Sequence, residues 1–221
     1  MTSTIRAVIA CLALTAAPAV QQAAADREEV DAARIDWAAG RITAGGTGIA
    51  DRHAPSPAIA LGTSRRGAEA AARRRIAAKL GALPLAAGGT LATKLADPVI
   101  KARVDAAVEA AITIAAEPET DGSWHVTLAA PLEAIRIAVD QPRVLPAAGD
   151  QGPPIVVVER VTAKPALGWT IGGAPAATLW VRSVPAWAKD APRMTAGAVR
   201  AGAIALGSAA PPSALYVLVA N

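Results

Sequence analysis

The segment 41–50, RITAGGTGIA, alternates with the period of a β-strand, and one of its two faces is almost bare of side chains. The positions on that face are Ile42, Ala44, Gly46, Gly48 and Ala50. Glycine is unfavourable inside a strand, and a common reason for its presence is the close approach of another backbone. We therefore predict that a neighbouring element packs directly against Gly46 and Gly48.

The neighbour is expected to be a helix over residues 58–80, which begins after two prolines and ends before Gly81. Its apolar stripe at helical spacing comprises Leu61, Ala68, Ala72, Ile76 and Leu80. Glu69 and Arg73 are spaced for an i,i+4 ion pair. An alanine-lined helix on a glycine-rich strand allows close packing, which explains both compositions together.

A second helix is predicted over residues 97–111. Asp97 is a favourable N-cap, and Pro98 takes the first helical position, where proline is well tolerated. The apolar stripe comprises Ile100, Val104, Ala107, Val108 and Ala111. Lys101 and Asp105 are again four residues apart, so they can form an ion pair on the helix surface.

Residues 112–132 predict a β-hairpin around a turn at Asp121-Gly122. A two-residue loop there would put Ile114 and Leu128 on opposite faces. A three-residue loop that ends at a left-handed Gly122 gives one coherent apolar face, so we prefer it. The pairs that it predicts are Ile112 with Ala130, Ile114 with Leu128 and Ala116 with Val126.

The second half of the chain changes in composition at residues 140–154, where four prolines and two glycines indicate a linker. Short strand candidates follow at residues 155–161, 177–184, 203–206 and 215–219. The predicted fold class is α+β. A small antiparallel sheet packs on a long Ala/Arg-rich helix and a second helix in residues 26–139, and a small β-rich unit follows in 155–221. Because its strands are short, we expect this unit to depend on the first for burial.

The first 25 residues have the layout of a secretory signal peptide. Arg6 precedes a short apolar run, and cleavage after Ala25 or, earlier, after Ala19 would release the mature chain. The run is shorter than the roughly 20 residues of a membrane span. The only cysteine, Cys11, would be lost on cleavage, unless residues 8–11, VIAC, act as a lipoprotein processing box and Cys11 is acylated. We expect a periplasmic, outer-membrane-associated or secreted protein.

No set of residues in the mature chain predicts catalysis, a cofactor or a metal site. The glycine-rich segment lacks the Lys-Ser/Thr of a phosphate-binding loop, and His53 and His125 have no second ligand at metal spacing, so we expect both to be solvated. Asp105 and Glu109 form a helical carboxylate pair that acid–base chemistry could use. The net charge of +4 is mild, and an exported chain without interleaved aromatics has little reason to bind nucleic acid.

Arginines and tryptophans are the strongest candidates for a contact surface. The arginines spread around the predicted helix, and two tryptophans lie in loops, where they are either tucked inward or displayed to a partner. The candidates are Arg65, Arg66, Arg73, Arg74, Trp169 and Trp187. Trp124 and Trp180 follow strand patterns and are expected in the core.

The order of these segments resembles a bacterial envelope family. The resemblance rests on the segments AGGTGIA, AEAAARRRIAAKL, ADPVIKARVDAAVEAA and the hairpin ITIAAEPETDGSWHVTLAAPL. It covers about residues 37–139. The later PPIVVVERVTAKPALG is similar to a companion piece found in some members. The family comprises small surface lipoproteins of Gram-negative bacteria and the N-terminal domain of flagellar assembly protein T. The resemblance implies a sheet that wraps a long helix, periplasmic or outer-membrane association, no known catalysis and no active-site residues to transfer.

These patterns together predict a non-catalytic exported envelope protein that acts by contact with another envelope protein or with itself. An open sheet edge in the hairpin, together with the loop tryptophans, would provide the contact. The alternatives are a periplasmic hydrolase that uses a carboxylate pair, and a small-ligand carrier with an apolar cavity between the two regions.

Overall fold

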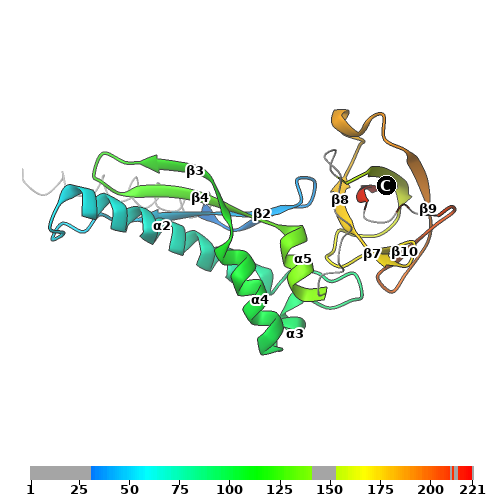
Figure 1. The fold of residues 1–221 in the computed structure, drawn as a ribbon, viewed down its shortest axis with the longest axis horizontal. Coiled ribbons are helices and arrows are strands. Elements are labelled where there is room, and N and C mark those ends of the chain that lie inside the picture. The colour runs from blue at the N-terminus through cyan, green and yellow to red at the C-terminus, as the bar shows by residue number, and fades with distance from the viewer. Residues whose placement is uncertain (1–30, 141–152, 210, 212–213, 221) are drawn as a thin grey trace, which may run out of the picture.

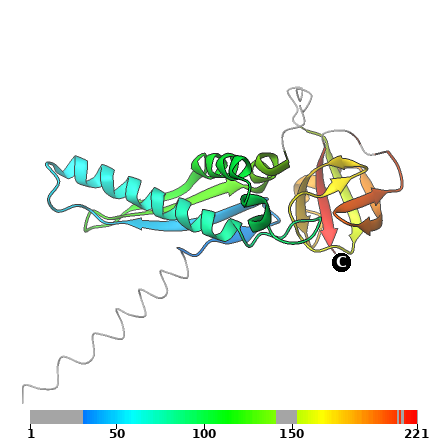
Figure 2. The same cartoon turned by 90° about the horizontal axis from the view of Figure 1, so that it is seen from below.

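The computed structural model describes residues 31–140, 153–209, 211 and 214–220. The expected signal peptide and most of the 140–154 linker lie outside these residues. Within them, two sheets lie one after the other in an elongated molecule, with the helices gathered on the first (Figures 1 and 2). The α+β fold class predicted from the sequence is confirmed.

The first sheet has four strands in the order β1-β2-β4-β3, and every neighbouring pair is antiparallel. The strands are β1 (Arg34–Asp36), β2 (Arg41–Gly48), β3 (Ile112–Pro118) and β4 (Trp124–Pro131). The long helix α2 (Pro57–Leu80) runs along one face of this sheet (Figure 2). It packs on the two central strands, β2 and β4, which leaves β3 at the margin.

The predicted close approach of α2 to the glycine-rich strand is confirmed. A Cβ atom on Gly46 would collide with backbone atoms of Ala68 and Ala72, and one on Gly48 would collide with the backbone of Ser64. The Ser64 hydroxyl donates a hydrogen bond to the Gly48 carbonyl at 2.5 Å. The absence of side chains at Gly46 and Gly48 therefore allows the backbone of α2 to pack directly on the strand.

The predicted helix stripe is correct except at its start. Ala68, Ala72, Ile76 and Leu80 are buried, but Leu61 is 40% exposed. The buried Ser64 takes the corresponding place against the last residue of β2. Leu61 lies three residues before Ser64, almost one turn nearer the start of α2. Because β2 has already ended at that point, the sheet does not cover Leu61.

Three further helices lie at the end of the first sheet that is nearer to the second sheet (Figure 1). They are α3 (Leu91–Leu95), α4 (Pro98–Glu109) and α5 (Leu132–Asp140). The predicted cap of α4 is confirmed, because Asp97 accepts hydrogen bonds from the backbone N–H groups of Val99 and Ile100. The predicted Lys101–Asp105 ion pair is also present, at 2.6 Å. Across the described ranges, no helix combines the length and the apolarity needed to cross a membrane.

Helix α5 and the short elements β1 and α3 were not predicted. Leu132, Ile135 and Val139 are buried at helical spacing, a signal that the sequence does contain. Arg136 is also buried and binds Glu133 at 2.6 Å. The hydrogen bond to Glu133 raises the pKa of Arg136 above its ordinary value, against the opposing effect of burial.

The predicted hairpin register holds only near the turn. Gly122 has a φ of 83° and Ala116 pairs with Val126, as expected for the three-residue loop. Between Thr113 and Ala115 the register shifts by one residue, so Ile112 pairs with Ala129. The predicted pairs Ile112–Ala130 and Ile114–Leu128 are therefore wrong. The extra residue is tolerated because β3 is an edge strand, and a bulge disturbs only its one ladder.

The second sheet has seven strands in the order β7-β6-β10-β9-β5-β11-β8, and it curls around its own core (Figure 1). The strands are β5 (Ile155–Val161), β6 (Thr170–Ile171), β7 (Ala174–Pro175), β8 (Ala177–Val181), β9 (Arg193–Arg200), β10 (Ala203–Leu206) and β11 (Leu215–Ala220). All four predicted strands are present, with β8 three residues shorter than expected, and β6, β7 and β9 were missed. The core includes Trp169, Trp180 and Tyr216.

The two units are also joined by backbone hydrogen bonds. The Trp180 N–H donates to the Trp37 carbonyl at 3.0 Å, which extends the edge of β8 into the turn between β1 and β2. Leu167 donates to Pro84 and accepts from Ala86, at 2.9 and 2.8 Å. Trp37 and Ala86 also pack against the core of the second unit, as the expectation of shared burial requires.

Candidate interaction surface

The strand β3 forms an open edge of the first sheet. Its only ladder within the described residues is the one with β4, and six of its seven residues are exposed. Two of them are large and apolar: Ile112 is 59% exposed and Ile114 is 44% exposed. An edge strand presents backbone N–H and C=O groups that can pair with another strand. We call this surface the β3 edge.

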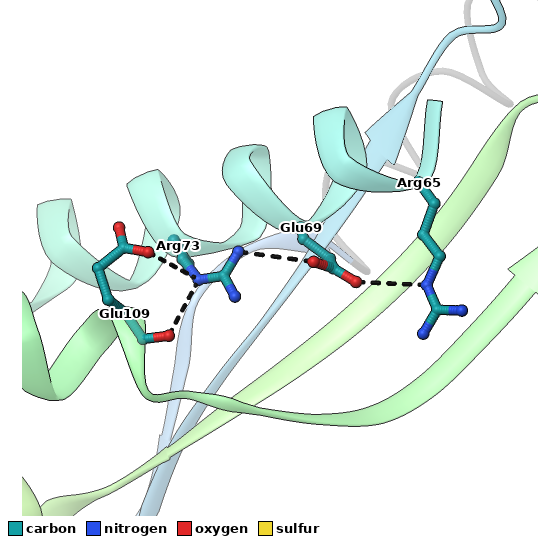
Figure 3. A network of polar contacts seen from close by, with 4 residues as sticks. All are labelled: Arg65, Glu69, Arg73 and Glu109. Atoms are coloured by element: carbon teal, nitrogen blue, oxygen red, sulfur yellow. Dashed lines mark hydrogen bonds and ion pairs between the residues drawn. The ribbon is translucent and has the colours of Figure 1, made fainter. Parts of the chain in front are cut away.

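A row of alternating charges runs beside the β3 edge. Along α2, Arg65 lies 3.3 Å from Glu69, and Glu69 lies 3.7 Å from Arg73. Arg73 then reaches Glu109, the last residue of α4, at 3.3 Å (Figure 3). We call Arg65, Glu69, Arg73 and Glu109 the charged row.

The two ends of the charged row mark the two ends of β3. The guanidinium of Arg65 lies 5.3 Å from the centre of the Trp124 ring, and Trp124 pairs with Pro118 at the end of β3. Glu109 comes just before Ile112, where β3 begins. The row therefore runs along the length of the strand, with a cation–π contact fixing Arg65.

The six residues predicted for contact do not form one surface. Arg65 and Arg73 belong to the charged row. Arg74 is exposed and lines the groove between α2 and α4, and Arg66 is exposed outside both. Trp187 is displayed, 56% exposed, in the short 3-10 helix η1 (Ala186–Ala188) of the second unit.

Of the two alternatives for Trp169, the structure shows the one in which the ring is tucked inward, so this residue is not part of an exposed contact surface. Its side chain is only 6% exposed, and its ring packs 5.8 Å from that of Trp180. The loop is folded over the ring because the curled second sheet needs a large side chain to fill its interior. Trp180 is buried as predicted, whereas Trp124 is only partly buried under Arg65.

The carboxylate pair Asp105 and Glu109 lines a groove of about 400 Å³ between α2 and α4. The two side chains are 51% and 74% exposed, and each already holds an ion pair, with Lys101 and Arg73 respectively. Both carboxylates therefore lie in an open groove where cations already engage them.

A polar cluster on the sheet face away from α2 was not predicted. Asp31 is buried there against Gly45, with Oδ2 2.7 Å from Nη1 of Arg75. Its Oδ1 lies 3.5 Å from Nε2 of His125, and Nδ1 of His125 lies 3.5 Å from the Thr47 hydroxyl. The expectation of a solvated His125 is wrong, since its side chain is only 20% exposed.

This cluster has the order of an acid–histidine–hydroxyl chain. Both distances from His125, at 3.5 Å, are longer than the roughly 2.6–3.2 Å of a close hydrogen bond. The Asp31 carboxylate is held by the guanidinium of Arg75, which also donates to the Gly45 carbonyl at 2.8 Å. Within the described ranges, no group of three or more His, Cys, Asp or Glu side chains could hold a metal ion.

Sequence reasoning missed this cluster because its members come from four separate segments. The only signal in the sequence is Gly45, whose missing side chain leaves room on the strand for another group to approach. Comparison with family models, with curated proteins and with solved structures found no match to this chain. The resemblance to the envelope family therefore stays a prediction.

Proposed function

We propose that this chain is an exported, non-catalytic envelope protein that works by binding another protein strand along the β3 edge. The observation that carries the proposal is the open ladder of β3, with Ile112 and Ile114 exposed at 59% and 44%. Isolated apolar side chains on a surface are ordinary, but two on an unprotected edge strand favour strand addition. The signal-peptide layout of residues 1–25 supports export.

The physical basis is the pairing of backbone groups. A partner strand would take the N–H and C=O groups that β3 leaves to water, and would cover the two isoleucines at the same time. The bulge at Ile114 divides the edge into two short runs, which limits unspecific pairing of the kind that leads to aggregation. The charged row beside the strand would add selectivity through the signs of its charges.

The test is photo-crosslinking in the native host. A photoreactive amino acid replaces Thr113 on β3 in one variant and the 63% exposed Val99 at the start of α4 in the control. We expect a discrete adduct from position 113 and none from position 99. Mass spectrometry of the exported protein, beginning at Asp26 or Val20, checks the export that the proposal also requires. An absence of adducts at position 113, or a full-length chain in the cytoplasm, would overturn the proposal.

A further inference from the structure

The charged row has a sign pattern that is complementary to its own reverse. From Arg65 through Glu69 and Arg73 to Glu109, the signs are plus, minus, plus, minus. Read in the opposite direction, the same row is minus, plus, minus, plus. If two copies of the row lie side by side and antiparallel, opposite charges face each other at every position. If they lie parallel, like charges face each other at every position.

An antiparallel arrangement also results when two identical edge strands pair about a two-fold axis perpendicular to the sheet. A two-fold axis perpendicular to the sheet relates two β3 strands, joins the two four-stranded sheets into one, and keeps both α2 helices on the same face. Because the charged row runs along β3, the two rows become antiparallel with the strands. We propose that the partner at the β3 edge is a second copy of this chain, paired about such an axis; this rests on the proposed function.

The dimensions allow the two rows to meet. Helix α2 lies over β2 and β4, so the two helices would be separated by about four strand spacings, or about 19 Å. Helices with their side chains are about 10–12 Å across, which leaves a gap of under about 10 Å. Extended arginine and glutamate side chains span such a gap, so Arg65 can reach the other copy's Glu109, and Glu69 its Arg73.

The pairing would also cover what is now exposed. Ile112 and Ile114 lie on the strand that the second copy would join, and Glu109 is the most exposed member of the row, at 74%. Each ion pair on a surface contributes little by itself, so the row would act chiefly by selecting direction and partner. High salt is expected to weaken the dimer, since the charges are screened.

The test is a charge exchange between two variants of the full mature chain. In R73E, Glu69 of each copy faces a glutamate, and in E69R, Arg73 of each copy faces an arginine. We expect each variant alone to have a dimer dissociation constant at least about tenfold above that of the unmodified protein. A mixture of the two restores both contacts, so native mass spectrometry should show a heterodimer. Arg66→Glu, an equal charge change off the row, should dimerise normally.

A second pair of variants covers the case in which R73E or E69R fails to fold, as judged by circular dichroism. R65E and E109R exchange the outer contact in the same manner, and Glu109 lies at the exposed end of α4. An unmodified protein that is monomeric in sedimentation at micromolar concentration would overturn the inference. A heterodimer that is no tighter than the separate variants would also overturn it.

Crosslinking from position 113 separates this inference from the proposed function. An adduct of twice the mass of the chain, formed between two copies, supports both. An adduct with a different protein, and none between copies, overturns the second copy as partner while the proposed function stands. No adduct at all overturns both.

Discussion

At Gly46, one added methyl group would have to share space with the backbone of α2. Its Cβ would meet the Ala68 carbonyl and the Ala72 amide, neither of which can move unless the whole helix is displaced. We expect Gly46→Ala to lower the free energy of unfolding by about 1–3 kcal/mol, the usual cost of overpacking a core. The measurement is the midpoint of urea denaturation.

The matched control for that substitution is Gly62→Ala, inside α2. The new Cβ would have the tip of Arg66 as its nearest neighbour, at an ordinary 3.6 Å. Alanine is the better helix former, so the free energy of unfolding of this variant should rise by roughly 0.5–1 kcal/mol. The same substitution is thus expected to lower the free energy of unfolding at Gly46 and to raise it at Gly62. Equal losses at both would mean that the helix does not limit the space at Gly46.

The contact between Arg75 and Asp31 is a second place where one residue affects stability. Asp31 is 3% exposed, so removing its cation leaves a buried carboxylate without compensation. We expect Arg75→Met to cost about 1–3 kcal/mol in thermal or urea unfolding at neutral pH. Arg74→Met, an exposed neighbour on the same helix, should stay within about 0.5 kcal/mol of the unmodified protein.

A double-substitution cycle shows whether the cost comes from the ion pair itself. In an Asp31→Asn background there is no buried charge left to compensate, so Arg75→Met should cost much less than in the native chain. If the cost is the same in both backgrounds, Arg75 stabilises the protein through Gly45 or through packing instead.

At the scale of elements, patterns that are complete within a short segment could be predicted. The bare face of β2 and the alanine stripe of α2 explain each other, because close packing needs small residues on both sides. The Asp-Gly turn determined the loop of the hairpin, and the apolar runs of β5 and β10 gave both strands with their observed bounds.

Elements whose form depends on distant partners could not be predicted. The bulge in β3 exists because that strand is at an edge, which is a property of the whole sheet. Strand β9 carries only the weak alternation of Met194, Ala196 and Ala198, and it pairs with β5 from more than thirty residues away. The charged row was missed for the same reason: α2 and α4 bring Arg73 and Glu109 together only in the folded chain.

At the scale of the whole molecule, the orientation of the second unit depends on a few backbone contacts. The turn between β1 and β2 hydrogen bonds to β8, and the segment around Pro84 pairs with Leu167. Gly202, after β9, lies so close to this second contact that a Cβ there would be 2.9 Å from the amide nitrogen of Ala87. These contacts predict that both units unfold together.

Two glycines of the second unit allow this docking to be tested. Gly202 and Gly173 have nearly the same left-handed φ, 82° and 84°, so alanine costs about 1–2 kcal/mol of backbone strain at either. Only at Gly202 does the added Cβ also collide with the first unit, since nothing lies within 4 Å at Gly173. Calorimetry should therefore show one transition at lower temperature for Gly173→Ala, and two separate transitions for Gly202→Ala. Identical curves for both variants would mean that the contact at Ala86 and Ala87 does not couple the units, and the contacts of the β1–β2 turn, such as the hydrogen bond from Trp180 to Trp37, would then have to do so.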